Sequence, residues 1–106
     1  MQELSAKQVH ELLQAATVQP LLLDVRETWE YAICHIEGSE HVPMKSIPSK
    51  MAALDPAQET VVICHHGIRS RMVCQYLQQE GFTNVINLSG GVKSWAEQVD
   101  ASMPVY

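Results

Sequence analysis

One short segment, CHHGIRS at residues 64–70, brings together residue types that could do covalent chemistry. Cys64 directly follows the apolar run TVVI, so it stands where a buried strand would end. A cysteine acts as a nucleophile in its thiolate form, and a thiolate requires positive potential nearby. Gly67 permits a turn with positive φ that lets consecutive amides face one anion, and Arg69 adds a cation. The segment therefore predicts a nucleophilic cysteine in an anion-binding loop, with four residues between cysteine and arginine.

The charge distribution along the chain favours a small anionic ligand at this loop. The formal net charge is −5, which disfavours nucleic acid or an anionic membrane as a partner. Against this acidic background, no acidic residue lies between positions 60 and 79. Two of the three arginines, Arg69 and Arg71, lie in that stretch together with His65 and His66. Arg71 taken alone is typical of a solvated helix residue, so we expect the loop itself to contact the ligand.

The bulk composition is that of one small globular domain. The 106 residues are 46% hydrophobic and 18% charged, which suffices for one modest core and predicts a single domain over residues 1–106. The longest apolar runs are far below membrane-spanning length, and the N-terminus lacks the basic-then-apolar order of a secretory signal. Three cysteines at no zinc-finger spacing argue against a disulfide framework and for a reducing, cytoplasmic setting.

Strand and helix patterns alternate along the whole chain. Apolar runs predict buried strands at 21–25, 60–64 and 84–88, with a very short strand near 41–42. Helix signals comprise a Ser5–Gln8 capping box before a helix that ends ahead of Pro20, a helix over 26–33 capped by Thr28, one near Pro48, one from Ser70 to Gly81, and one over 92–99. This alternation predicts an α/β domain with a largely parallel sheet, in which ligands bind at the carboxyl ends of strands.

A metal site is the competing use of these residue types. Cys34 and His35, together with Cys64, His65 and His66, offer five potential ligands. Adjacent residues bind one ion awkwardly, and no CxxC or HxxxH spacing is present. We therefore predict no metal and no cofactor.

Each cysteine can also serve as a small apolar residue in a core, which is the commonest role of a free cysteine. For Cys64 the strand end, glycine, arginine and helix start all stand in the order that a nucleophile requires. Cys74 lies on a predicted helix among Met72, Val73 and Leu77, which is typical of a packing residue.

Four segments, taken together in this order, resemble the single-domain form of the rhodanese-like sulfurtransferase family over essentially the full chain. They are LLLDVRE at 21–27, EYAICHIEGSEHVP at 30–43, CHHGIRS at 64–70 and GFTNVINLSGGVKSW at 81–95. The resemblance implies a doubly wound sheet of five strands, largely parallel, with helices on both faces. It also implies that the Cys64 thiolate takes the outer sulfur of thiosulfate or a similar donor and holds it as a persulfide.

The resemblance also implies residue roles. Cys64 is the nucleophile, and the donor-binding groups are the backbone amides of His65, His66, Gly67, Ile68 and Arg69. The Arg69 side chain would bind the anionic end of the donor. Asp24 and Arg26 are expected to be structural supports, because buried charges require partners. Trp95 is expected in the core.

The loop length separates this family from its phosphatase and arsenate-reductase relatives. The family's loop has six residues counted from the cysteine, as residues 64–69 do here, whereas the relatives' loop is one residue longer and accommodates a tetrahedral oxyanion. Two departures from the family pattern lie outside the loop: Cys34 replaces a glycine and His41 replaces an asparagine. Cys34 is either a tolerated small residue or a second thiol able to meet a persulfide.

Several functions remain open at this point. The leading one is a sulfurtransferase that uses a small anionic donor and a thiophilic acceptor, which is cyanide, a dithiol or a protein thiol such as that of thioredoxin. The alternative is a persulfide carrier that a partner protein loads, with low turnover of thiosulfate. A phosphatase or arsenate reductase is disfavoured by loop length. A non-catalytic interaction domain is disfavoured because such domains often lack the cysteine.

Overall fold

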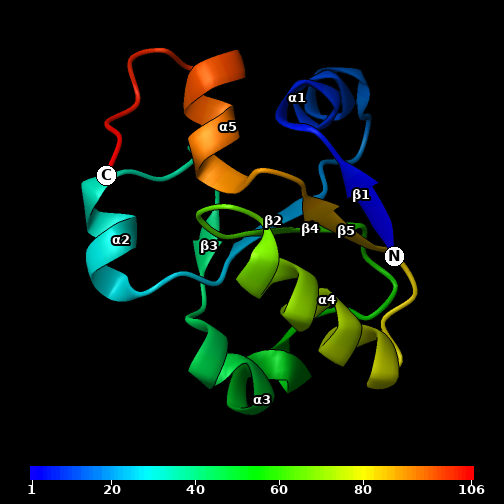
Figure 1. Ribbon diagram of the computed structural model, residues 1–106. Coiled ribbons are helices and arrows are strands. Elements are labelled where there is room, and N and C mark those ends of the chain that lie inside the picture. The colour runs from blue at the N-terminus through cyan, green and yellow to red at the C-terminus, as the bar shows by residue number, and fades with distance from the viewer.

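The computed structural model describes all 106 residues and contains one five-stranded sheet in which every strand pair is parallel (Figure 1). The strand order is β1-β5-β4-β2-β3. The strands are β1 Gln2–Leu4, β2 Leu21–Asp24, β3 Glu40–His41, β4 Thr60–Ile63 and β5 Val85–Leu88. The predicted α/β fold class is thus confirmed. The edge strand β1 was not predicted, because three residues of sequence QEL carry no apolar run, and only pairing with β5 defines the strand.

The helical segments are α1 Ala6–Ala15, α2 Thr28–Ile33, η1 Met44–Ser46, α3 Ile47–Lys50, η2 Met51–Ala53, α4 Ile68–Gln79 and α5 Gly91–Gln98. The capping box at Ser5 and Gln8 is confirmed. The prediction that Thr28 caps α2 is wrong: Glu27 is the N-cap, and its backbone N–H donates to the Glu30 carboxylate over 2.9 Å. None of the helices has the length and apolar character that a membrane span requires.

Two apolar cores lie on opposite faces of the sheet. Helices α1 and α5 lie on one face and α3 and α4 on the other, as Figure 1 shows. The first core includes Val9, Ile86 and the predicted core residue Trp95, and the second includes Val62, Val73 and Leu77. Strands β2, β4 and β5 are fully or almost fully buried because both faces are covered, which explains their continuous apolar sequences.

The chain runs in opposite directions across the sheet from its two central strands. After β2 it continues to β3 on one side, and after β4 it continues to β5 on the other side. The loops that follow β2 and β4 therefore leave a crevice between them at the carboxyl ends of these strands. Cys64 follows β4 at this point, and Asp24 ends the neighbouring β2.

The N-terminus of α5 supports the loop that follows β4. The backbone N–H of Val92 donates to the carbonyl of Cys64 over 2.9 Å, and that of Lys93 donates to the carbonyl of His65 over 3.2 Å. This close approach requires glycine at position 91, where φ is +61° and an added Cβ would overlap both carbonyl oxygens. The double glycine at 90–91 thus explains how α5 reaches the loop.

We expect Gly91→Ala to destabilise the protein by more than about 2 kcal/mol, since a left-handed residue costs about 1–2 kcal/mol and the clash adds to it. Gly81→Ala is the matched control, because φ there is also positive, at +96°, but no atom lies near the added Cβ. The control should lose only about 1–2 kcal/mol, the backbone contribution alone. Urea unfolding measures both, and equal losses would contradict the packing account.

Candidate active site

Cys64 lies at the end of β4, where its sulfur faces a loop amide and the start of helix α4. Its side chain is buried, with the residue only 1% exposed. The backbone N–H of Gly67 donates to Sγ over 3.0 Å, and the hydroxyl of Ser70 lies 3.3 Å from the same atom. Helix α4 begins at Ile68, so its N-terminal dipole points at the sulfur. The loop therefore supplies positive potential mainly from its backbone.

A buried polar network lies beneath the loop. The Ser70 hydroxyl donates to Oδ1 of Asn87, whose Nδ2 donates to the Gly67 carbonyl over 3.0 Å and to Glu3 over 2.8 Å. Because Nδ2 has two acceptors, the amide orientation is fixed and Oδ1 faces Ser70. Sequence reasoning missed both Ser70 and Asn87. The only signal for Asn87 was an amide within a strand that is otherwise apolar.

The Arg69 guanidinium lies at the mouth of the site, paired with Glu30 of α2. Two hydrogen bonds join them, Nη1 to Oε1 over 2.6 Å and Nη2 to Oε2 over 2.8 Å. The bonds from Arg69 lower the pKa of Glu30 to about 2, although burial of the carboxylate opposes this. Glu30 is therefore ionised at neutral pH, and its charge balances that of Arg69. Nothing in the sequence near Glu30 indicated this contact.

A second ion pair, fully buried, anchors the turn after β2. Arg26 Nη2 lies 2.8 Å from Asp24 Oδ2, and both side chains are inaccessible to solvent. The same Nη2 donates to the carbonyl of Cys34 over 2.6 Å. These bonds hold the start and the end of α2 together, and they thereby position Glu30 opposite the loop.

Tyr106 links the two ion pairs. Its hydroxyl donates to Glu30 Oε2 over 2.8 Å and accepts from Arg26 Nη1 over 2.9 Å. Burial raises the pKa of Tyr106 to about 12, so the phenol stays protonated. Tyr106 was not predicted, because no local pattern connects it to residues 76 and 80 positions away in sequence.

The histidines of the loop form one wall of the site. The His65 ring lies 4.3 Å from the ring of Tyr106 and 4.1 Å from that of His66. Burial and the neighbouring His66 lower the pKa of His65, so this ring is neutral at pH 7 and adds no charge there. The mouth above Cys64 has a volume of about 300 Å³ and is lined by Glu30, Cys64, His65, His66, Ile68 and Arg69.

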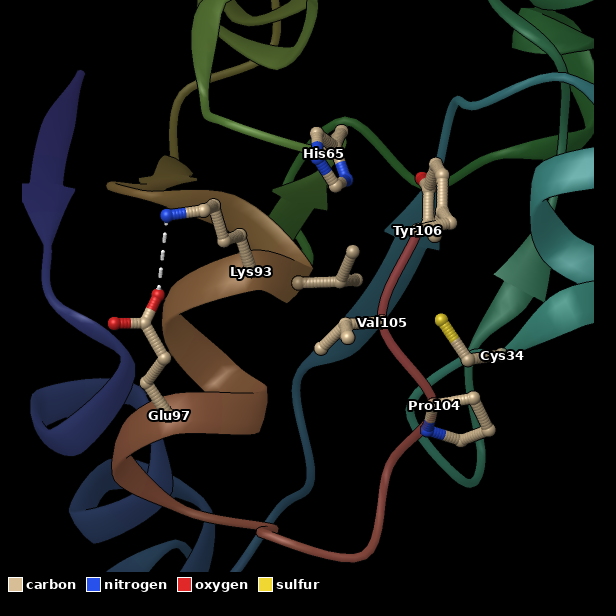
Figure 2. Close-up of a pocket in the computed structure, with 8 residues that line it drawn as sticks. Cys34, His65, Lys93, Glu97, Pro104, Val105 and Tyr106 are labelled. Atoms are coloured by element: carbon tan, nitrogen blue, oxygen red, sulfur yellow. Dashed lines mark ion pairs between the residues drawn. The ribbon is translucent and has the colours of Figure 1, made fainter.

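His65 also borders a second cavity of about 250 Å³ between α5 and the C-terminal residues (Figure 2). Cys34, Pro104, Val105 and Tyr106 form its walls, and the Lys93–Glu97 ion pair lies along α5 at 3.4 Å. Cys34 Sγ lies 3.9 Å from Arg26 Nη1. The structure thus gives Cys34 a buried position beside the site, and the question of a second reactive thiol stays a prediction.

The third cysteine has no access to the site chemistry. Cys74 lies on α4 with its side chain in the second apolar core, and burial raises the pKa of its thiol to about 12. The predicted packing role of Cys74 is consistent with both observations. No group of three or more His, Cys, Asp or Glu side chains comes together in an arrangement that could hold a metal ion.

Comparison with known proteins agrees with this architecture. The model of the rhodanese-like domain matches residues 5–98. The putative sulfurtransferase YtwF of Bacillus subtilis is 40% identical over 90% of each chain, and the thiosulfate sulfurtransferase GlpE of Pseudomonas aeruginosa is 33% identical over 89% of this chain and 83% of its own length. The crystal structure of a rhodanese-like domain protein from Staphylococcus aureus superimposes with a TM-score of 0.85 at 24% identity, covering 100% of this chain and 99% of the other.

The single proton of the Ser70 hydroxyl is donated to Asn87, so toward Cys64 this hydroxyl can only accept a hydrogen bond, from the neutral thiol. We therefore expect Ser70→Ala to speed alkylation of Cys64 by iodoacetamide at pH 7.5 about fivefold, since a neutral hydrogen bond is worth about 1 kcal/mol. Ser49→Ala is the control, because that exposed hydroxyl bonds only to the carbonyl of Ser46. Peptide mapping by mass spectrometry measures the rate at Cys64 and shows that Cys74 stays unmodified. An unchanged rate in Ser70→Ala would remove Ser70 from the account.

Proposed function

The chain belongs to the rhodanese-like domain family, and from this premise we propose that it transfers a sulfane sulfur from thiosulfate or a similar donor to a thiophilic acceptor through a persulfide on Cys64. The observation that carries the proposal is the position of Cys64 Sγ, buried at the end of β4 with the Gly67 amide 3.0 Å away. Relatives named as sulfurtransferases support the same chemistry.

The proposed reaction has two balanced steps. The Cys64 thiolate attacks the outer sulfur of thiosulfate, so that a sulfur–sulfur bond forms at Sγ while the bond to the sulfonate sulfur breaks. Sulfite leaves with the electron pair of that bond. A thiophilic acceptor, which is cyanide, a dithiol or a protein thiol, then attacks the outer sulfur of the persulfide and regenerates the thiolate.

The loop geometry supports sulfur rather than phosphoryl transfer. Six residues, 64–69, enclose the sulfur, and the first turn of α4 begins within them. Backbone amides around one sulfur atom would stabilise the anionic persulfide as they do the thiolate. A loop of this length leaves little room for a tetrahedral phosphoryl group beside Cys64.

A persulfide carrier loaded by a partner protein is the second candidate. Three exposed apolar side chains favour it: Ile68 and Met72, one turn apart on α4, and Trp29, which precedes Glu30 on α2. Exposed apolar side chains around a site are typical of protein–protein contact.

A dithiol protein of the thioredoxin type is the acceptor we propose. The three unpaired cysteines fit a reducing, cytoplasmic setting, in which such dithiol proteins are kept reduced.

We expect incubation with thiosulfate to add the mass of one sulfur atom to the peptide that contains Cys64. Cyanide should then remove that mass and yield thiocyanate. Cys64→Ser should lose both, whereas Cys74→Ser, the control at a buried thiol, should retain them. Full thiocyanate production by Cys64→Ser would refute the assignment, and poor loading by thiosulfate with efficient loading by a protein persulfide would favour the carrier.

We expect Arg69→Ala to raise the KM for thiosulfate about tenfold, with little effect on sulfur transfer from a loaded Cys64, because an unmatched Glu30 carboxylate would repel the anionic donor at the mouth. Loss of Arg69 also leaves the Glu30 carboxylate without its partner. Arg71→Ala is the control, since it removes the same charge from an exposed position on α4. Steady-state and single-turnover kinetics separate the two steps, and a defect confined to acceptor transfer would contradict this role for Arg69.

A further inference from the structure

The arginines near the loop are all paired with carboxylates. The cationic sequence around Cys64 therefore does not give the site a net positive charge. Each of the three arginines has its own acidic partner: Arg26–Asp24 at 2.8 Å, Arg69–Glu30 at 2.6 Å and Arg71–Glu3 at 2.7 Å. His65 is neutral at pH 7 because its pKa is lowered. The ion pairs at the site therefore carry no net charge, and the attraction for an anion comes mainly from backbone amides at the base of the loop.

The Glu30 carboxylate is held in place against the guanidinium of Arg69 and accepts hydrogen bonds from both of its Nη atoms. Each of its oxygens accepts two hydrogen bonds: Oε1 from Arg69 and the backbone of Glu27, and Oε2 from Arg69 and the hydroxyl of Tyr106. Glu30 is only 4% exposed. Four hydrogen bonds from three residues thus fix the carboxylate. Arg69 cannot turn to an incoming anion without breaking its bidentate pair with Glu30.

This arrangement has different consequences for two classes of sulfur donor. Thiosulfate is a dianion whose sulfonate end remains at the mouth while its outer sulfur enters the loop. There it either lies beside the Glu30 carboxylate or competes with it for Arg69, and both are unfavourable. The persulfide group of a persulfide donor carries at most one charge, on the outer sulfur that the loop amides receive. The remainder of such a donor requires no cation at the mouth.

We propose that Glu30 is a specificity-determining residue that selects persulfide donors, R–S–SH, over thiosulfate. The inference rests on the proposed persulfide chemistry at Cys64 and names the donor class of that site. In the loading step the Cys64 thiolate attacks the outer sulfur, the new bond forms at Sγ, and RS⁻ leaves with the electron pair of the broken bond. The products are the Cys64 persulfide and RS⁻, which water protonates to a thiol, with no change in net oxidation.

The experiment measures how fast the Cys64 peptide gains one sulfur from each donor, in the native protein and in Glu30→Gln. The donors are thiosulfate, 2-mercaptoethanol persulfide, whose organic part is uncharged, and persulfidated serum albumin as a protein-borne source. Glu37→Gln is the matched control, because Glu37 is exposed and lines no part of the mouth above Cys64, yet its loss changes the net charge equally.

We expect Glu30→Gln to accelerate loading from thiosulfate about tenfold or more, the effect of removing one charge close to an anion. Loading from 2-mercaptoethanol persulfide should stay within about threefold. Glu37→Gln should change neither. Equal loading from thiosulfate in the native protein and Glu30→Gln, or equal acceleration by Glu37→Gln, would overturn the inference while leaving persulfide chemistry at Cys64 intact. A native protein that no donor loads would contradict the proposed function and the inference together.

A second measurement avoids substitution, in case Glu30→Gln does not fold. Raising the salt concentration weakens interactions between charges at the mouth. Loading of the native protein from thiosulfate should therefore rise with salt relative to loading from 2-mercaptoethanol persulfide. A relative fall with salt would show attraction to an unmatched cation and would overturn the inference. The albumin donor distinguishes the sources: loading faster than from 2-mercaptoethanol persulfide supports a protein-borne persulfide, and slower loading supports a small one.

Discussion

The hydrogen bond from the Gly67 amide to Cys64 Sγ is the interaction on which the site depends. It requires the left-handed conformation of Gly67, with φ at +98°, which turns the loop amide inward just before α4 begins. It also requires that the loop be held from behind, where Val92 of α5 donates to the Cys64 carbonyl. Two helix N-termini thus meet at one loop: α4 begins beside the sulfur, and α5 donates to the backbone carbonyls behind it.

Side-chain charges, unlike the loop amides, position the elements of the site and do not contact the sulfur. The Arg26–Asp24 pair is fully buried and fixes the ends of α2, and α2 in turn carries Glu30 to Arg69. Tyr106 joins these two pairs through one hydroxyl. Charges that are matched in this way position the loop and its mouth without creating a strong field. The backbone can therefore stabilise a sulfur anion while the mouth remains unattractive to doubly charged ligands.

The sequence predicted the local features and missed the distant ones. The apolar run before Cys64, the glycine at 67 and the capping box at Ser5 are readable because each depends on neighbouring residues. Glu30 could not be assigned, because its partner Arg69 lies 39 positions away and any of the acidic residues could have filled that place. The same holds for Asn87 and Glu3, which are 84 positions apart and meet only when β1 pairs with β5.

The proposed chemistry requires the loop amides to bind one extra sulfur atom on Cys64. Amide proton and nitrogen chemical shifts of residues 65–69, recorded by NMR before and after loading and again after removal of the sulfur by cyanide, test it most directly. A hydrogen bond to the new sulfur should move the amide proton of Gly67 and its neighbours downfield, and cyanide should reverse the change. Loading that adds sulfur to Cys64 while these amides keep their shifts would contradict the account.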